Sequence, residues 1–389
     1  METSNRRDFL KKVAVGSAAA GASIAASGLF PRRIIAEDTS EFTRLAYRML
    51  GSTGYKTTEV GFGAMNTRNA ELIEAAIDAG INYLDTAHGY MNGENEKIVG
   101  RVLKGKRDKV FLVTKIHWAN PEKMPGMIET SLKRLQTDHV DILFLHVTDK
   151  RELILRDDLM KIFDDARKKG YTRYIGVSSH SNQAEVLDAS VESNFWEAVL
   201  VGYNYNSPPN VSVSIKKARE AGLAIIGMKN ILNVQEPEVL KGKKGEMNPQ
   251  QALFKWVLED RYVDTIIPGI TSFEQLADDL AIMGMKLSFD EHRNLRRYSE
   301  SLKGSYCSGV AGCTGCKDKC PRGVDISQIN RCMGYVYGYN DIELAHENYR
   351  NLPGSNRLDI CDDCDECLVK CVNGINLTEN IKRARSLFA

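Results

Sequence analysis

The strongest constraint on the fold is a regular alternation of short apolar runs with longer segments of helical periodicity. The apolar runs cover residues 59–65, 81–85, 110–115, 141–146, 171–178, 198–203, 223–228 and 264–268. The segments between them, such as 70–79 and 159–169, carry apolar residues three to four positions apart, which is typical of helices with one buried face. Strands that alternate with helices predict a parallel sheet with right-handed crossovers.

The number of repeats distinguishes between two parallel architectures. Eight strand–helix units in roughly 210 residues predict an α/β fold of the closed (β/α)8 TIM barrel type. The alternative is an open, doubly wound sheet, which usually carries G-x-G-x-x-G after its first strand. The corresponding turn here, Gly61-Phe62-Gly63-Ala64-Met65-Asn66, lacks the third glycine, which favours the barrel. Residues 45–58 are predicted to form a short hairpin that closes the barrel floor.

The cysteines divide the chain into two modules. All 9 lie between Cys307 and Cys371, so the long N-terminal part of the chain has none. We therefore predict a barrel domain at 41–300 and a separate, smaller domain at 301–389.

Lys and Arg number 52 against 51 Asp and Glu, a net charge of +1. This balance gives no reason to expect nucleic acid or an anionic membrane as a partner.

Residues 1–36 are expected to be a targeting segment and not part of the fold. The stretch Asn5-Arg6-Arg7-Asp8-Phe9-Leu10-Lys11 is followed by a run rich in Ala, Gly and Ser at 13–30. This pattern resembles a twin-arginine signal peptide. It implies a periplasmic or extracellular protein that uses the twin-arginine export machinery. An anchoring helix is the alternative, but such small residues make a poor anchor, so we expect no stable membrane span in the mature form.

Polar residues stand at the ends of three successive predicted strands, where the chemistry of such barrels takes place. Asp85 ends the second strand, Lys115 the third and His146 the fourth, and Tyr90 follows Asp85 in its loop. A lysine ammonium near a tyrosine lowers the pKa of its phenol, and a paired carboxylate fixes the lysine. A histidine can hold a carbonyl oxygen near the tyrosine hydroxyl. Together the four predict a catalytic set that protonates an oxygen while hydride reaches the adjacent carbon.

These residues resemble the motifs of the aldo-keto reductases. The resemblance rests on Asp85-Thr86-Ala87-x-x-Tyr90, Gly93-x-Asn95-Glu96-x-x-x-Gly100, Thr114-Lys115 and His146, and it spans residues 47–286. It implies a (β/α)8 barrel that uses NADPH to reduce small aldehydes and ketones, or oxidises the matching alcohols. It also implies that Tyr90 is the general acid, that Lys115 and Asp85 tune it, and that His146 positions the carbonyl.

The cofactor positions follow the family pattern less closely. Ile175-Gly176-Val177-Ser178 resembles the family's fifth strand, but Ser179 stands where an asparagine is usual. The family's basic residues for a 2′-phosphate are absent after the last strand, so the cofactor is NADP or NAD. Ser272 and Gln275 form a capping pattern that exposes amides to an anion or serves as a plain structural cap. The predicted cofactor-binding residues are Ser178, Ser179, Tyr203 (stacked on the nicotinamide), Thr271, Ser272 and Gln275.

The tail carries two sets of closely spaced cysteines. Cys361-x2-Cys364-x2-Cys367-x3-Cys371 has the spacing of a bacterial ferredoxin, in which the fourth cysteine ligates the other cluster. The second set is Cys307-x5-Cys313-x2-Cys316-x3-Cys320-Pro321. We predict a ferredoxin-like domain with two 4Fe-4S clusters, with disulfides or zinc as alternatives. The crossed arrangement assigns Cys307, Cys313, Cys316 and Cys371 to one cluster, and Cys361, Cys364, Cys367 and Cys320 to the other.

The whole layout resembles the iron–sulfur branch of the aldo-keto reductases. It implies an exported oxidoreductase in which hydride chemistry at the barrel is linked to electron transfer through the clusters, to or from a redox partner protein. Two alternatives remain open at this point: an electron carrier that uses the barrel as a scaffold, and a reductase whose tail clusters are structural. The sequence identifies neither the substrate nor the oligomeric state.

Overall fold

The computed structural model describes most of the barrel and much of the tail. The described residues are Arg6, Phe9, 45–118, 120–231, 249–301, Cys307, Cys313, 315–316, 318–338, 342–361 and 367–388. Apart from Arg6 and Phe9, the predicted export signal at 1–36 lies outside these residues, as does Cys364. Within the described part of the chain, a search for helices with the length and apolar character of a membrane span finds none.

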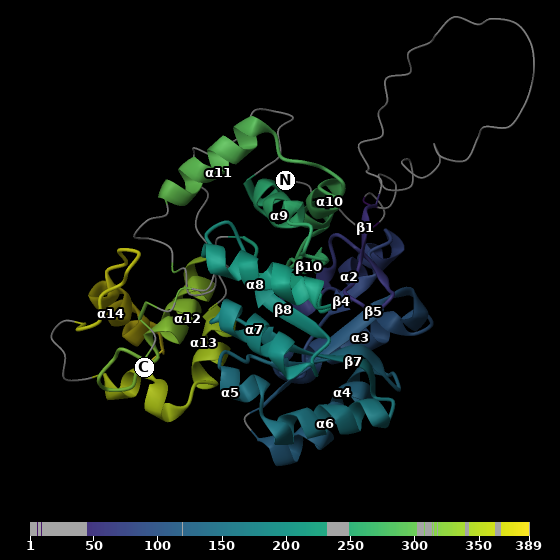
Figure 1. Ribbon diagram of the computed structural model, residues 1–389, viewed down its shortest axis with the longest axis horizontal. Coiled ribbons are helices and arrows are strands. Elements are labelled where there is room, and N and C mark those ends of the chain that lie inside the picture. The colour runs from purple at the N-terminus through teal and green to yellow at the C-terminus, as the bar shows by residue number, and fades with distance from the viewer. Residues whose placement is uncertain are drawn as a thin grey trace, which may run out of the picture.

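Eight parallel strands form the barrel wall, and each strand pairs with its neighbours in sequence. The strands are β3 (Phe62–Gly63), β4 (Tyr83–Asp85), β5 (Phe111–His117), β6 (Val140–His146), β7 (Thr172–Ser179), β8 (Ala198–Gly202), β9 (Ala224–Met228) and β10 (Thr265–Ile266). Parallel bridges from Val60 to Ile266 and from Gly63 to Gly269 join the first strand to the last. The sheet is therefore closed, which confirms the barrel and excludes the open doubly wound sheet (Figure 1).

Helices cover the outside of the wall, as the repeats predict. They are α2 (Ala70–Asp78), α3 (Glu94–Leu103), α4 (Met124–Leu135), α6 (Asp157–Lys168), α7 (Gln183–Ser193), α8 (Pro209–Glu220), α9 (Pro249–Glu259) and α10 (Phe273–Ala281), with α5 (Arg151–Ile154) and α11 (Phe289–Ser301) as additions. Because strand side chains alternate in direction, the core has two layers. Phe144 and Leu200 fill the barrel interior, whereas Leu143 and Val199 pack between the wall and the helices.

The predicted hairpin is present and lies at the floor of the barrel. Its strands β1 (Tyr47–Met49) and β2 (Lys56–Thr58) pair antiparallel. Its turn is held to the floor because the Gly51 amide donates to Asp264 Oδ2 at 2.9 Å. A side chain at Gly51 would meet the backbone of Ala224 at 2.4 Å, and its φ is +51°. Glycine is therefore required by both space and backbone conformation.

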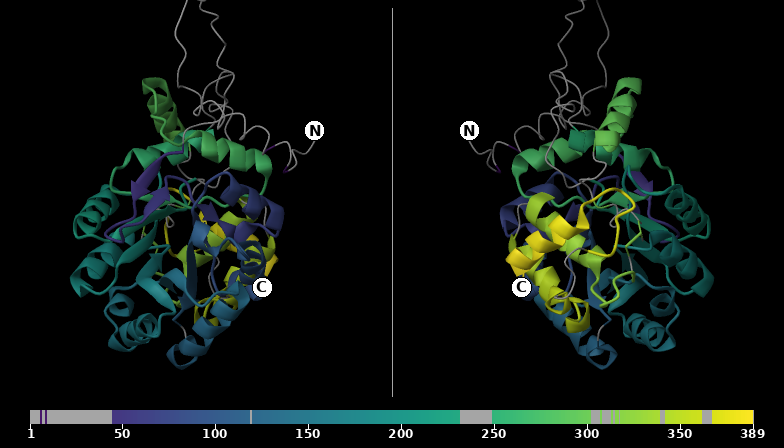
Figure 2. Two further views of the ribbon diagram at one scale, coloured as in Figure 1. Left: turned by 90° about the vertical axis from the view of Figure 1, so that its right-hand side faces the viewer. Right: turned by 90° about the vertical axis from the view of Figure 1, so that its left-hand side faces the viewer.

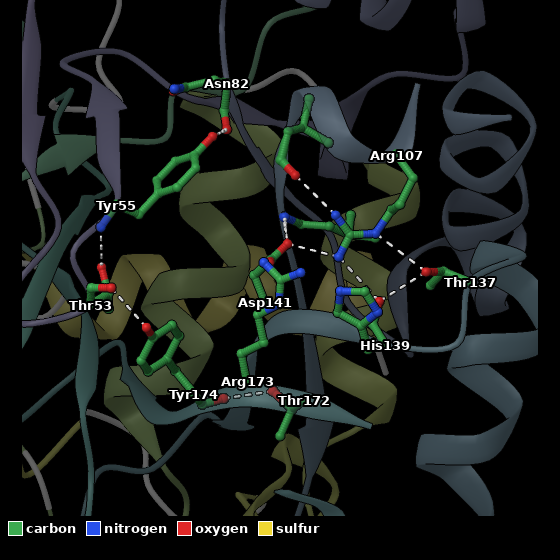
Figure 3. Close-up of polar contacts among 12 residues, drawn as sticks. Thr53, Tyr55, Asn82, Arg107, Thr137, His139, Asp141, Thr172, Arg173 and Tyr174 are labelled. Atoms are coloured by element: carbon green, nitrogen blue, oxygen red, sulfur yellow. Dashed lines mark hydrogen bonds and ion pairs between the residues drawn. The ribbon is translucent and has the colours of Figure 1, made fainter. Parts of the chain in front are cut away.

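Charged and polar contacts hold the strands together at this same end (Figure 3). Asp141 accepts hydrogen bonds from Arg107 Nη2 and from the Leu112 amide, both at 2.8 Å. Its other oxygen lies 3.0 Å from Arg173 Nη1. Tyr174 donates to the Thr53 carbonyl of the hairpin at 2.8 Å. The floor thus carries contacts that stabilise the barrel, which leaves the opposite end for chemistry.

The tail forms a helical domain with its own apolar core. Its elements are α12 (Ile326–Gly338), α13 (Ile342–Arg350), the short turns η8 (Gly354–Asn356) and η9 (Leu358–Ile360), and α14 (Leu377–Phe388). Ile329, Met333 and Ile381 are among its buried residues. Figure 2 shows this domain in front of one end of the barrel. That end is the mouth, because Lys229, just after β9, lies 3.3 Å from the Tyr335 hydroxyl on α12.

Two residues of the predicted export signal contact the barrel. Arg6 forms ion pairs with Glu74 at 2.6 Å and with Asp78 at 2.9 Å, both on α2. The ring of Phe9 is 1% exposed and lies 5.9 Å from the ring of Phe273, the first residue of α10. An arginine of the twin-arginine pattern is therefore paired with the barrel surface, and a phenylalanine of the pattern is buried against it.

Candidate active site

The four predicted catalytic residues converge at the mouth of the barrel. Asp85 is the last residue of β4, Lys115 lies near the end of β5, His146 ends β6, and Tyr90 opens the short helix η3 (Tyr90–Gly93). Pairing of β4 with β5 and of β5 with β6 is parallel, so these strand ends point the same way. The sequence placed the residues correctly because they stand at successive strand ends.

Lys115 connects the members of this set. Its ammonium donates to Asp85 Oδ1, to the Thr86 carbonyl at 2.7 Å and to the Tyr90 hydroxyl at 3.4 Å. Lys115 is 1% exposed and Asp85 2%, whereas Tyr90 and His146 are half-buried. The rings of Tyr90 and His146 meet edge to face, 5.9 Å apart. A buried ion pair thus supports two groups that a small ligand can reach.

Buried side chains of the next helix fix the loop that carries Tyr90. Thr86 donates to Asn95 Oδ1 at 2.6 Å, and Asn95 Nδ2 donates to the Ala64 carbonyl at 2.7 Å. Glu96 accepts from the Thr114 hydroxyl at 2.7 Å. These contacts tie the ends of β3, β4 and β5 to α3. The motif that includes Asn95 and Glu96 is therefore a positioning device for the catalytic set.

The backbone after Tyr90 is strained in a way that presents its side chain. Met91 and Asn92 have φ of +50° and +53°, and Gly93 has φ of +87°. Non-glycine residues in the left-handed region are uncommon and gather at functional sites. Val147 after β6 and Lys229 after β9 share this conformation, with φ of +57° and +55°. Strained residues therefore surround the mouth.

Burial governs the electrostatics of the site and corrects one prediction. Burial raises the pKa of Asp85 and lowers that of Lys115, and each partially compensates the other. The sequence predicts a lowered pKa for Tyr90, but burial, with the Asp85 charge second, raises its pKa well above the ordinary value. The physical reason is that Asp85 neutralises Lys115 before Lys115 can act on the phenol. Tyr90 therefore keeps its proton at neutral pH.

Three histidines line the mouth, and one of them, His146, belongs to the tetrad. His117 and His146 end β5 and β6 and are partners in register, and His180 directly follows β7. Burial is the main cause that lowers the pKa of each one. His146 is therefore an uncharged imidazole that can donate a hydrogen bond to a carbonyl oxygen. His180 Nδ1 has no hydrogen-bond partner among the described residues.

The predicted cofactor residues on β7 and β8 fall on different sides of the wall. Ser178 and Ser179 are buried at the end of β7, and the Ser178 hydroxyl accepts from the Val147 amide at 3.1 Å. Tyr203 lies in the outer layer, with its hydroxyl 3.2 Å from Asp260 and its ring 5.3 Å from that of Trp256. Because Tyr203 packs against the outer helices, its position does not suit the predicted stacking on a nicotinamide ring.

The predicted phosphate loop is a capped helix start. Ser272 is the N-cap of α10 and accepts from the Gln275 amide at 3.1 Å. Gln275 Oε1 in turn accepts from the Thr271 amide at 2.8 Å and from its hydroxyl at 2.9 Å. The capping box of the sequence is thus present, and it satisfies these donors within the chain. Whether the loop also receives an anion stays a prediction.

The described cysteines fall into two groupings. Burial and the neighbouring Cys313 and Cys371 raise the pKa of Cys316 to about 11, and Asn373 Nδ2 lies 3.7 Å from Cys313 Sγ. Separately, Cys320, Cys361 and Cys367 line one pocket. None of the eight described cysteines forms a disulfide, and no group of three or more described His, Cys, Asp or Glu residues has the arrangement of a single-ion site.

The sequence missed the residues that α12 contributes to the mouth. Tyr335 is 3% exposed, and its ring lies 4.6 Å beneath the Lys229 ammonium. The charge of Arg331 acts on His117, His146 and His180. The available signal was the polar spacing along α12, but the docking of one domain on another cannot be read from periodicity.

Comparison with known proteins follows the same division of the chain. The model of the aldo/keto reductase family matches residues 50–233. The uncharacterized oxidoreductase YqkF of Bacillus subtilis is 33% identical over 150 residues, which is 34% of this chain and 48% of the relative. The aldo-keto reductase YhdN of the same organism is 33% identical over 160 residues, which is 35% of this chain and 48% of the relative. The chain thus spans about half the length of these curated relatives. A probable aldo-keto reductase of Glycine max is 24% identical over 65% of this chain and 88% of its own length.

Solved structures agree on the fold. An aldo/keto reductase of Klebsiella pneumoniae, in complex with NADP and acetate, has a TM-score of 0.56 at 22% identity and covers 65% of this chain and 95% of its own. The aldo-keto reductase AKR11C1 of Bacillus halodurans has a TM-score of 0.56 at 23% identity, covering 65% and 96%. Residues 50–233 of the barrel are similar to the aldo/keto reductase family.

Proposed function

We propose that this protein is an exported, nicotinamide-dependent oxidoreductase that interconverts a small carbonyl compound and its alcohol. The observation that carries the proposal is the placement of the Lys115 ammonium 3.4 Å from the Tyr90 hydroxyl, with the His146 ring 5.9 Å from that of Tyr90. Further support comes from the Klebsiella pneumoniae structure, which holds NADP beside the same type of barrel.

The geometry supports a proton transfer from Tyr90 to a carbonyl oxygen. A bound nicotinamide would supply the hydride that goes to the carbonyl carbon. The Tyr90 O–H bond breaks as its proton passes to the carbonyl oxygen, and Lys115 stabilises the phenolate that remains. His146 is uncharged and donates a hydrogen bond to the same oxygen, which keeps it near Tyr90. Oxidation of the alcohol runs through the same steps in reverse.

The mouth has two unpaired polar side-chain atoms that hydrogen bonds to a bound dinucleotide would satisfy. Asn66 Oδ1 and His180 Nδ1 are buried without hydrogen-bond partners among the described residues. Asn66 lies directly over Gly269, where a side chain would meet its amide at 2.8 Å, so glycine at this position leaves room for the Asn66 side chain. Ser178, Ser179 and the Thr271–Gln275 turn would hold the two ends of the cofactor. Basic residues for a 2′-phosphate are absent from that turn, so both NADP and NAD remain candidates.

The test is turnover of a panel of aldehydes and ketones with NADPH and with NADH. We expect Tyr90→Phe to lower kcat by about 100- to 10,000-fold, which is the usual contribution of a general acid. Tyr47→Phe on the exposed hairpin is the matched control and should retain full activity. If both variants reduce carbonyl compounds as fast as the unmodified protein, or if no nicotinamide binds at all, the scaffold hypothesis replaces this one.

We further propose that the tail binds two 4Fe-4S clusters, which carry single electrons when bound. Support comes from the proximity of Cys313, Cys316 and Cys371 and from the pocket lined by Cys320, Cys361 and Cys367. Each grouping joins cysteines from both sequence motifs, as a crossed pair of clusters requires. Cys307 and Cys364 complete the two sets in this proposal.

Iron and sulfide analysis after anaerobic purification tests the cluster proposal. We expect about eight irons per chain and about half of that in Cys371→Ala. The pairing makes a specific prediction: Cys313→Ala and Cys371→Ala should remove the same EPR signal, while Cys320→Ala removes the other. Cys332→Ala, which changes a buried cysteine of the tail core, is the control. A preparation that contains zinc, disulfides or no metal would contradict the proposal.

Export by the twin-arginine route is the remaining part of the proposal, and it is supported by the sequence pattern at Arg6 and Arg7. Cell fractionation of the full chain tests it. The expected result is periplasmic or extracellular protein, and cytoplasmic retention of a variant with both arginines changed to lysine. Periplasmic recovery of that variant in equal amount would contradict it.

A further inference from the structure

Arg134, on the outer helix α4, contacts the strained turn that carries Tyr90. Its Nη1 donates to the His88 carbonyl at 3.0 Å. Its guanidinium also lies against Gly93, because a Cβ added to that glycine would overlap the guanidinium atoms. His88 precedes Tyr90 and Gly93 ends the turn, so one side chain contacts the backbone on both sides of Tyr90.

The same guanidinium nitrogen joins this turn to the strand that carries Lys115. Nη1 of Arg134 lies 3.3 Å from Glu96 Oε2, and Glu96 Oε1 accepts from the Thr114 hydroxyl at 2.7 Å. Thr114 directly precedes Lys115 on β5, and the His88 amide donates to the Lys115 carbonyl at 3.1 Å. The contacts therefore form a closed ring that runs from the turn through Arg134 and Glu96 to β5 and back to the turn.

The turn requires support of this kind because its backbone conformation is unfavourable. Met91 and Asn92 have φ of +50° and +53°, and such residues persist only where the surrounding structure fixes them. The path of the turn decides where the Tyr90 hydroxyl lies, which is 3.4 Å from Lys115 Nζ. A displacement of about 1 Å at a reacting group can lower a rate by about 100-fold. A group that fixes the turn therefore has a large influence on the proton transfer.

We propose that Arg134 is a positioning residue, which holds the Tyr90 hydroxyl at its distance from Lys115 by joining His88 and Gly93 to Glu96. The inference rests on the proposed function, because it concerns the proton transfer at the same site. Arg134 contacts the supports of Tyr90 and Lys115, and it acts on the reaction through them.

A role in stability alone makes a different prediction. Glu96 is 0% exposed, and Arg134 pairs with its carboxylate at 3.3 Å, so removal of the cation would leave a buried charge without its partner. The variant Arg134→Lys separates the two roles. It keeps a positive charge for Glu96, but it lacks the planar fork of donors that reaches Glu96 and His88 at once.

Steady-state reduction by the full chain tests the proposal, with the aldehyde or ketone that the protein reduces fastest. We expect Arg134→Lys to lower kcat by about 10- to 100-fold and to change the KM for the carbonyl compound by less than about two-fold. In the Tyr90→Phe background the same substitution should have no further effect, because both residues act on one step. A general defect in folding would lower the activity in both backgrounds. Lys133→Gln, at an exposed neighbour on α4, is the control and should keep full activity.

Tyrosine labelled with ¹³C at Cζ provides a readout that needs no turnover. The NMR signal of Tyr90 is assigned by its loss in Tyr90→Phe. We expect Arg134→Lys to shift this signal and Lys133→Gln to leave it in place. A shifted signal in a protein that reduces no carbonyl compound would support the positioning role and contradict the proposed function alone. An unshifted signal, or an equal fold-loss of kcat with and without the Tyr90 hydroxyl, would overturn the role of Arg134.

Discussion

Replacement of Lys115 by methionine removes the counter-charge of Asp85 at the centre of the site. Both side chains are buried, and Lys115 also donates to the Thr86 carbonyl at 2.7 Å. Removal of one partner from a buried ion pair costs about 3–5 kcal/mol. We expect the free energy of unfolding of Lys115→Met to fall by about that amount at neutral pH, because Asp85 is left without a partner for either oxygen.

The loss should depend on pH in a defined direction. Burial already raises the pKa of Asp85, and loss of Lys115 raises it further. A carboxyl group with a higher pKa in the folded state binds its proton more tightly there. The stability that this proton contributes is therefore complete below the unfolded pKa of about 4. It is lost as pH rises toward the pKa of the folded state. Lys115→Met should therefore be more stable at about pH 5 than at about pH 8.

The assay is urea unfolding followed by circular dichroism, with Asp85→Asn/Lys115→Met as the matched double variant. The double variant buries no net charge, so it should recover most of the lost stability while remaining inactive. Stability and catalysis would then separate, as expected if the pair serves the chemistry. The reasoning is refuted if Lys115→Met is as stable as the unmodified protein at pH 8, or if the double variant is no more stable than the single one.

Three further predictions follow from particular contacts. Asn95→Ala should lower the free energy of unfolding by about 2–3 kcal/mol in the same denaturation assay, because Thr86 and Ala64 both lose a buried partner; an unchanged midpoint would contradict this. Gly100→Ala should destabilise by about 1–3 kcal/mol, because a Cβ would meet the Arg134 carbonyl at 2.4 Å, whereas Gly126→Ala, with nothing within 4 Å, should be neutral or stabilising. The kcat/KM for reduction should be flat between about pH 6 and 9, because the pKa of Tyr90 is raised above its ordinary value of about 10; a decline near neutral pH that disappears in Tyr90→Phe would argue against it.

Local patterns predicted the barrel well because each repeat carries its own signal. The strand runs at 110–115 and 141–146 correspond to β5 and β6 with shifts of one or two residues. The predicted first and last strands, 59–65 and 264–268, are much shorter as β3 and β10. These are the two strands that close the barrel, where pairing is limited to isolated bridges. Closure depends on the curvature of the whole sheet, which periodicity does not encode.

The sequence predicted the location of the candidate site residues where position along a strand decides, and it did not where tertiary packing decides. Asp85, Lys115 and His146 were found because strand ends share one mouth. Tyr203 was misplaced although a signal existed: it has the same parity as Val199 and Val201, which face the helices, so it follows them outward. The raised pKa of Tyr90 depends on burial, and the contact of Tyr335 with Lys229 depends on how the tail docks. Neither property can be predicted from the spacing of residues along the sequence.

The central claim is that Tyr90 delivers a proton to a carbonyl while hydride arrives from a nicotinamide. Deuterium transfer from C4-deuterated NADPH or NADH to the aldehyde or ketone that the protein reduces fastest, followed by mass spectrometry of the alcohol, tests it most directly. We expect one deuterium at the new carbinol carbon, and a Tyr90→Phe variant that still binds the cofactor but transfers the deuterium at least about 100-fold more slowly. Product without deuterium, or equal transfer by the variant, would contradict the account.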